Sequence, residues 1–252
     1  MITDSFNLES GKISPEDIYG EGKFVSDICI VTFSYKLLDR IIKESDVRKV
    51  GEIHSTNGHI NVYSLIYQNR KICLYYSYMG AALAGTCMIE ASYLFGVKKF
   101  IMFGSCGRLS KSIPNNCVIV PTAAYRDEGF SYHYAPKNDY IDIKNHTFVE
   151  TFLSSKKIPY ISGRNWTTDA FYKETESEIK KRQREGCISV EMECAGCQAV
   201  SDFYKWDLYD YFFGGDLLDA EIWDKSNLGT DSEKRCHFDL FSIALDMAVS
   251  IK

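Results

Sequence analysis

The chain has 252 residues, of which 45% are hydrophobic and 25% are charged, as is usual for a soluble globular protein. This length is enough for one large α/β domain or two small ones. The net charge of −5 argues against a nucleic-acid groove or an anionic membrane as the main partner. No apolar run approaches the roughly 20 residues of a membrane helix, and residues 1–11 are too polar for a signal peptide.

The nine cysteines are scattered along the chain and odd in number. Most lie in apolar segments that we expect to be buried, which indicates reduced thiols in a cytoplasmic protein. Cys194 and Cys197 form a C-x-x-C pair, but no second pair follows at the spacing of a zinc site. We therefore expect this pair to pack on a helix, and we expect no metal.

The first half of the chain predicts alternating strands and helices after a polar arm at residues 1–26. The expected elements are a strand at 27–33, a helix at 37–43, a hairpin of strands at 60–67 and 71–77, a helix at 80–95 and a strand at 99–103. Gly96 stands just after the long helix, in the C′ position that favours glycine. The last strand runs into Gly-Ser-Cys-Gly at 104–107, which we expect to be a turn.

The second half continues the alternation of strands and helices. The expected elements are a strand at 117–121, a polar and aromatic loop at 125–136, a helix at 146–156, a strand beginning at 159–162, a charged helix at 174–185, a strand at 186–190, a helix at 194–200, a strand at 208–213 and a closing helix at 231–250. The loop is expected to be exposed and functional or interfacial, and the charged helix to be a solvated face. The alternation predicts one α/β domain at 27–252, with three layers (α/β/α) around a central, mixed and twisted sheet.

Polar groups follow four of the predicted strands, at 104–107, 166–172, 191–196 and 214–216. Ligands bind at strand ends in open α/β sheets, so these loops can converge on one cleft. Glu191 and Glu193 stand where a strand meets a helix, and each carboxylate there must be paired, hydrogen-bonded or used for binding. The residues alone leave a helix-capping role and a ligand-binding role equally open.

Other side chains in these loops suit a small organic ligand. The amides and hydroxyl of residues 104–107 can bind an anion, with a plain tight turn as the alternative. Phe171 and Tyr172 can stack on a planar base or pack in the core. Asp216 is either a proton donor or a turn aspartate, and Glu193 can bind a diol.

The combination of these stretches resembles the nucleoside phosphorylase superfamily. The shared motifs are Gly-Ser-Cys-Gly at 104–107, Thr-Asp-x-Phe-Tyr at 168–172, Val-Glu-Met-Glu at 190–193 and the strand-terminal Asp216. The superfamily includes purine nucleoside phosphorylases, uridine phosphorylases and methylthioadenosine nucleosidases, and the resemblance covers nearly the whole chain from Asp27. Residues 126–136, 166–169 and 215–224 are similar to a less characterised branch.

The resemblance implies that the protein cleaves the N-glycosidic bond of a nucleoside, favouring a purine, and releases base and ribose 1-phosphate. Inorganic phosphate would be the co-substrate, with no other cofactor, and the protein would be a homo-oligomer (dimer, trimer or hexamer). The implied ribose-binding residues are Met192, Glu193 and Glu191, and the implied base-binding residues are Phe171 and Tyr172. The implied phosphate-binding residues are Gly104, Ser105, Met79, Gly80 and Arg126. The resemblance makes Asp216 the acid that protonates N7 of the purine.

The chain departs from the phosphate-binding pattern of this superfamily. After the first strand, the usual Gly-Asp-Pro-x-Arg is Phe-Ser-Tyr-Lys-Leu at 33–37, so Leu37 replaces an arginine. Met102 replaces a second one, and each charge-assisted contact is worth about 1.5–3 kcal/mol. Other basic residues must then supply the charge, for which the candidates are Lys36, Arg108, Arg126 and Arg164. Otherwise water is the nucleophile, and the protein is a nucleoside hydrolase.

Two further alternatives stay open. Uridine phosphorylases read uracil with Gln and Arg shortly after the Phe-Tyr pair, where this chain has Thr175 and Ser177, which disfavours uridine. A catalytically silent nucleoside-binding protein on the same fold would also explain the altered phosphate motif.

Overall fold

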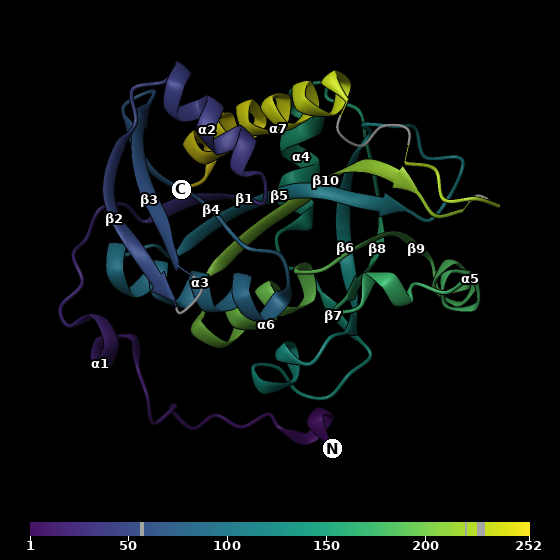
Figure 1. Ribbon diagram of the computed structural model, residues 1–252, viewed down its shortest axis with the longest axis horizontal. Coiled ribbons are helices and arrows are strands. Elements are labelled where there is room, and N and C mark those ends of the chain that lie inside the picture. The colour runs from purple at the N-terminus through teal and green to yellow at the C-terminus, as the bar shows by residue number, and fades with distance from the viewer. Residues whose placement is uncertain (56–57, 220, 226–229) are drawn as a thin grey trace.

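A computed structural model describes residues 1–55, 58–219, 221–225 and 230–252. A mixed β-sheet lies between two groups of helices (Figure 1). The helices on one face are α2 (Tyr35–Glu44), α4 (His146–Ser155) and α7 (Asp231–Ser250). Those on the other face are α3 (Ala81–Phe95) and α6 (Cys194–Tyr204), and the short α5 (Glu176–Arg184) packs beside β9. The predicted α/β fold with a mixed sheet is confirmed.

The sheet formed by the described residues has ten strands. They are β1 (Ile28–Thr32), β2 (Arg48–Ser55), β3 (Gly58–Tyr67), β4 (Arg70–Tyr76), β5 (Lys99–Arg108), β6 (Val118–Asp127), β7 (Tyr140–Asp142), β8 (Tyr160–Thr168), β9 (Cys187–Glu191) and β10 (Asp207–Leu217). Their order is β10-β6-β8-β9-β5-β1-β4-β3-β2, and β7 pairs with β6. Strand β2 is absent from the predicted elements, because its polar and charged residues lack a clear apolar alternation.

Half of the sheet closes on itself. β5 pairs with β9 on one side and with β10 on the other, while β10, β6, β8 and β9 pair in succession. Closing a sheet removes its free edges. The sequence pattern predicts most of the strands, with β2 and β7 as the exceptions, but it does not predict this closure, because the alternation within a strand does not specify its partners.

Strand β1 lies in the centre of the sheet, between β4 and β5 and parallel to both. All five of its residues are buried, which explains why this segment is a continuous apolar run. The predicted hairpin is confirmed, since β3 and β4 are antiparallel and are joined through Gln68 and Asn69 with φ of 47° and 66°. Gly96, with φ of 80°, ends α3 as predicted.

The predicted glycine turn at 104–107 is wrong, because these residues continue β5. Strand β10 likewise continues through residues 214–216, beyond its predicted end. A Cβ on Gly214 would lie only 2.6 Å from Cδ of Arg108. Glycine therefore makes room for a side chain of the neighbouring strand at this position and does not mark a turn.

The predicted exposed loop at 125–136 is also wrong. Its first three residues complete β6, and Phe130–His133 form a short 3₁₀ helix, η2. Arg126, Ser131 and Tyr132 are buried. Nε of Arg126 donates to Oγ of Ser131 at 2.8 Å, and the guanidinium lies 4.0 Å from the centroid of the Tyr132 ring. The segment is thus a packed part of the fold.

The N-terminal arm runs along the outside of the molecule (Figure 1). It contains η1 (Ile2–Asp4) and α1 (Pro15–Tyr19), and the Asp17 carboxylate caps α1 by accepting the N–H of Ser14 at 2.8 Å. Tyr93 on α3 donates to the carbonyl of Gly20 at 2.5 Å, which ties the arm to the helix layer. The arm is therefore attached to the fold at its C-terminal end.

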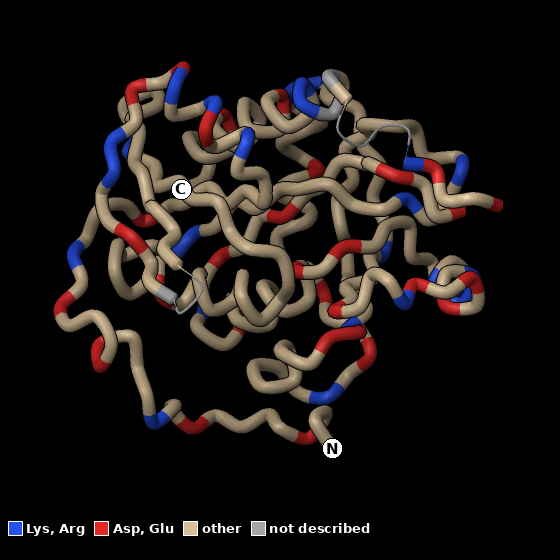
Figure 2. The backbone as a smooth tube through the Cα atoms, in the orientation of Figure 1, with Lys and Arg blue, Asp and Glu red and all other residues tan. Residues whose placement is uncertain are grey.

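Acidic and basic residues are interspersed along the chain (Figure 2). All nine cysteines are free thiols, and eight of them are buried, in agreement with the predicted packing role. Among the described residues, no helix is both long enough and apolar enough to cross a membrane.

Candidate active site

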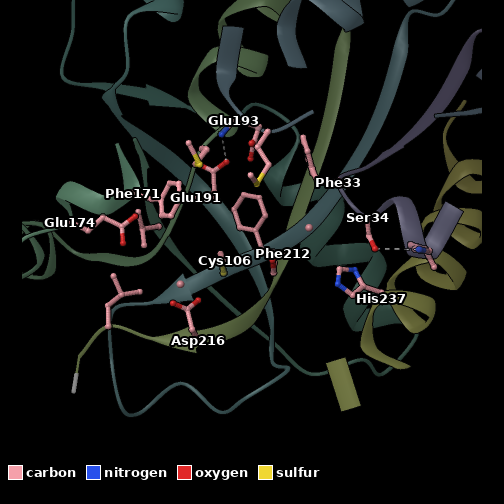
Figure 3. Close-up of a pocket in the computed structure, with 18 of the residues that line it drawn as sticks. Phe33, Ser34, Cys106, Phe171, Glu174, Glu191, Glu193, Phe212, Asp216 and His237 are labelled. Atoms are coloured by element: carbon pink, nitrogen blue, oxygen red, sulfur yellow. Dashed lines mark hydrogen bonds between the residues drawn. The ribbon is translucent and has the colours of Figure 1, made fainter. Parts of the chain in front are cut away.

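A cavity of about 920 Å³ opens where β1, β5, β9 and β10 end (Figure 3). Its lining includes Lys36, Met79, Gly104, Ser105, Phe171, Tyr172, Glu174, Glu191, Met192, Glu193, Asp216, Trp223 and His237. The loops and strand ends that the sequence singled out therefore meet at one place. All of the predicted site residues except Gly80 and Arg126 line this cavity.

Glu191 holds the start of α6 in place. Its Oε1 accepts hydrogen bonds from Nδ2 of Asn165 and Oγ1 of Thr167, both at 2.6 Å. Its Oε2 accepts the backbone N–H groups of Glu193 and Cys194, at 2.6 and 2.7 Å, which have no acceptor within the helix because they stand at its start. Four donors thus occupy the carboxylate, and Glu191 has the capping role that the sequence left open.

Glu193 joins the N-terminal ends of two helices. It immediately precedes α6, and its Oε1 accepts the N–H of Gly80, the residue before α3, at 2.6 Å. Burial and the neighbouring charge of Glu191 raise the pKa of Glu193 to about 8. Since Glu191 has four donors to its carboxylate, Glu193 is the member of the pair that holds a proton at neutral pH. A protonated carboxyl group can both donate to and accept from a diol.

Phe171 and Tyr172 form an aromatic wall of the cavity. They lie in the short 3₁₀ helix η3 (Phe171–Lys173), with ring centroids 3.9 Å apart. Phe171 is 43% exposed and Tyr172 is 90% exposed, so neither ring is part of the core. Exposed rings beside a cavity are available to a flat ligand.

Asp216 is half-buried near the end of β10. Its Oδ2 accepts a hydrogen bond from Nε1 of Trp223 at 2.6 Å. Leu217 and Asp224 exchange two backbone hydrogen bonds, at 3.0 and 3.2 Å, and so hold Trp223 over the carboxylate. The role of Trp223 was not predicted, since nothing in the local sequence pairs it with Asp216.

Glu174 is a cavity residue that the sequence did not reveal. The sequence pattern assigns it to a solvated charged helix, but it precedes α5 and stands two residues after Tyr172 of the aromatic wall. Burial and the charge of Asp216 raise the pKa of Glu174 to about 7. The one available signal was its position three residues after Phe171.

A family model described as the Phosphorylase superfamily matches residues 27–208, which is more than half of the chain. The chain belongs to the phosphorylase superfamily. This membership confirms the resemblance carried by the Val-Glu-Met-Glu motif and by the residues around the cavity.

Relatives in this superfamily are described as DeoD-type purine nucleoside phosphorylases. The protein from Aliivibrio fischeri is 26% identical over 217 residues, which are 84% of this chain and 88% of that protein. The protein from Photobacterium profundum is 30% identical over 162 residues, 62% of this chain and 64% of that protein. The protein from Buchnera aphidicola is 29% identical over 142 residues, 55% of this chain, and the match spans 60% of its length.

The two positions where superfamily phosphorylases usually carry arginine are filled by buried apolar side chains. Leu37 is 4% exposed and Met102 is 1% exposed, and both pack in the core. The basic side chains that line the cavity come from two helices: Lys36 and Arg40 from α2, and Lys234 and His237 from α7. Arg40 is paired with Glu44 at 2.9 Å.

Of the four basic residues proposed to replace the superfamily arginines, Lys36 lines the cavity. The other three are outside the described cavity lining, and each donates to a backbone carbonyl. Arg108 donates to Ile113 at 2.6 Å, Arg126 to Pro136 at 2.6 Å, and Arg164 to Glu185 at 2.9 Å. The guanidinium of Arg126 therefore stabilises its own loop.

Proposed function

We propose that the protein is a nucleoside phosphorylase that cleaves the N-glycosidic bond of a purine nucleoside with inorganic phosphate. The products would be the free base and ribose 1-phosphate. The observation that carries the proposal is the meeting of Glu193, the Phe171–Tyr172 wall and Asp216 in one cavity. Membership of the phosphorylase superfamily supports it.

Glu193 and Met192 are the proposed ribose-binding residues. Breaking the glycosidic bond leaves positive charge on the sugar. Glu193 hydrogen-bonds the 2′- and 3′-hydroxyls, and the carboxylate of Glu191 behind it adds negative potential. Because the sugar is more positive in the transition state than in the ground state, this potential lowers the barrier.

The base is proposed to stack against Phe171 and Tyr172. Bond cleavage leaves negative charge on the departing base, which a proton removes. The superfamily resemblance gives this proton transfer to N7 of a purine to Asp216, which lies at the same end of the cavity. Thr175 and Ser177, which stand at the uracil-reading positions of uridine phosphorylases, lie outside the described lining, and this favours a purine.

Phosphate is proposed to bind at the opposite side of the cavity, near Ser105 and the start of α2. Ser105 is the exposed residue of an otherwise mostly buried β5, and Ser34 is the N-cap of α2. Met79 and Gly80 border the ribose and phosphate positions. Lys36 supplies positive charge where the superfamily arginine is replaced, and the N-terminal end of α2 adds to it.

A nucleoside hydrolase is the second candidate, and the buried Leu37 and Met102 favour it. Incubation with inosine, adenosine, guanosine and uridine, with and without phosphate, distinguishes the two. We expect base release from purine nucleosides only when phosphate is present. Equal release without phosphate would support the hydrolase, and binding without any base release would support a silent binding protein.

The protein is further proposed to be a cytoplasmic homo-oligomer. The free thiols of all nine cysteines fit a reducing compartment. The segment at 125–136 is the proposed subunit contact, through the residues that it leaves exposed, such as His133 and Pro136.

A further inference from the structure

The cavity holds a second acidic group at its base-binding end that the proposed mechanism does not use. Glu174 lines the cavity directly after the aromatic wall, and Figure 3 shows its carboxyl group near Phe171 and on the same side as Asp216. Among the described residues, no donor hydrogen-bonds to the Glu174 side chain. A half-buried carboxyl group without a donor is poorly suited to carry a charge.

Asp216 has the opposite environment. An indole N–H is only a donor, so Trp223 at 2.6 Å requires Oδ2 of Asp216 to be an acceptor. This hydrogen bond occupies Oδ2 as an acceptor, so that oxygen is not the one that carries a proton to the base. Of the two carboxyl groups at this end of the cavity, Glu174 is the one with no hydrogen-bond donor among the described residues, and it is therefore the better suited to hold a proton that it can give up.

We propose that Glu174, in place of Asp216, is the group that delivers the proton to the departing base, and that Asp216, held by Trp223, orients the base. This inference rests on the proposed nucleoside cleavage. The raised pKa of Glu174, about 7, agrees with this division, since burial and then Asp216 are its causes. Other titratable groups of the lining lie on β5 (Cys106), on η3 (Tyr172), on β9 and its junction with α6 (Glu191, Glu193), on α2 (Tyr35, Lys36, Arg40) and on α7 (Lys234, His237).

The step balances in protons and electrons. An oxygen of the phosphate forms a bond to C1′ as the bond between C1′ and the base nitrogen breaks. The electron pair of the broken bond moves into the base, which takes the proton from the Glu174 carboxyl group at a ring nitrogen. Glu174 becomes a carboxylate and is reprotonated from water, because the side chain is partly exposed.

The test compares two substrates in the wild-type enzyme and in four variants. Inosine needs a proton on its leaving base, whereas 7-methylguanosine already carries a positive charge there. Glu174→Gln should lower kcat/KM for inosine by about 10²–10⁴-fold and change that for 7-methylguanosine by no more than about threefold. Glu176→Gln, exposed and two residues away, should leave both substrates unaffected.

The pH dependence of kcat/KM distinguishes the role of Glu174 from that of Asp216. Wild-type kcat/KM for inosine should fall as the pH rises through about 7, where Glu174 loses its proton. In Glu174→Gln this fall of kcat/KM with rising pH should be absent. In Asp216→Asn the fall should remain but occur at lower pH, because the charge that raises the pKa of Glu174 has been removed. Glu174→Asp retains an acid and should recover part of the inosine activity, which checks against a folding defect.

Three results would overturn the inference. The first is near-wild-type turnover of inosine by Glu174→Gln. The second is an equal loss of kcat/KM for inosine and 7-methylguanosine in that variant. The third is disappearance of the fall of kcat/KM with rising pH in Asp216→Asn but not in Glu174→Gln. Absence of base release by the wild-type enzyme with every nucleoside would instead remove the proposed function itself, and this inference with it.

Discussion

At the scale of single residues, two glutamates two positions apart have different roles because their neighbours differ. Glu191 accepts four hydrogen bonds at 2.6–2.7 Å and is committed to the fold. Glu193 accepts the N–H of Gly80 and faces the cavity. The first is therefore expected to respond to mutation through stability and the second through activity.

A substitution at Thr167 tests the structural role of Glu191. Its Oγ1 donates to Glu191 and accepts the N–H of Ala195 at 3.0 Å. Thr167→Val keeps the shape but leaves both partners short of a hydrogen bond in a buried site. We expect a loss of about 1–3 kcal/mol in the free energy of unfolding, measured by urea denaturation. The exposed Thr147→Val on α4 is the control, and an equal effect there would contradict the assigned role.

Glu174 predicts a specific pH dependence of stability. Its folded-state pKa of about 7 lies above the ordinary value of 4.5, so the folded protein binds this proton more tightly than the unfolded chain does. Its contribution to stability is complete below about pH 4.5 and is lost as the pH rises through 7. Glu174→Gln should therefore raise Tm relative to wild type at pH 8 more than at pH 4.5.

Differential scanning calorimetry of wild type, Glu174→Gln and Glu176→Gln checks this prediction. The exposed Glu176 pairs with Lys180, so its variant should show no such gain at high pH. A difference between Glu174→Gln and wild type that is the same at both pH values would contradict the raised pKa.

At the scale of elements, the contact between α3 and α6 sets the position of Glu193. A Cβ on Gly196 of α6 would lie 2.6 Å from Cβ of Ala81 in α3. The glycine thus lets the two helix starts approach closely enough for Gly80 to reach Glu193.

Gly196→Ala should push the two helices apart. We expect a loss of about 1–3 kcal/mol in stability from overpacking, together with reduced nucleoside turnover. Gly129→Ala is the matched control, because a Cβ there meets its nearest described atom at 3.8 Å and the φ of −91° suits alanine. Unchanged activity and stability in Gly196→Ala would show that the close approach is not required.

Elements with a strong apolar pattern were predictable from sequence, and so were the polar residues at their ends. The buried β1, the hairpin and the glycine stop of α3 follow from burial, turn chemistry and backbone freedom. The turn at 104–107 was mispredicted because glycine serves close packing as well as turns. Glu174 and Trp223 were missed because their roles depend on contacts between segments far apart in the chain.

At the scale of the whole molecule, the closed half of the sheet brings the ends of β5, β9 and β10 to one cavity. The superfamily resemblance implies that such sites form at subunit contacts, so we expect a homo-oligomer. Light scattering at micromolar concentration should give a mass of at least twice 28.8 kDa. A monomer under these conditions would contradict the proposed assembly.

The most direct test of the proposed reaction follows phosphate itself. Phosphorus NMR of the wild-type enzyme with inosine and inorganic phosphate should show ribose 1-phosphate forming in a 1:1 ratio with hypoxanthine. The same sample with Glu193→Ala should form it about 10²–10³-fold more slowly, because the hydrogen bonds that position the 2′- and 3′-hydroxyls of the ribose are lost. Hypoxanthine release with free ribose and no consumption of phosphate, or equal rates in the two proteins, would contradict phosphorolysis at this cavity.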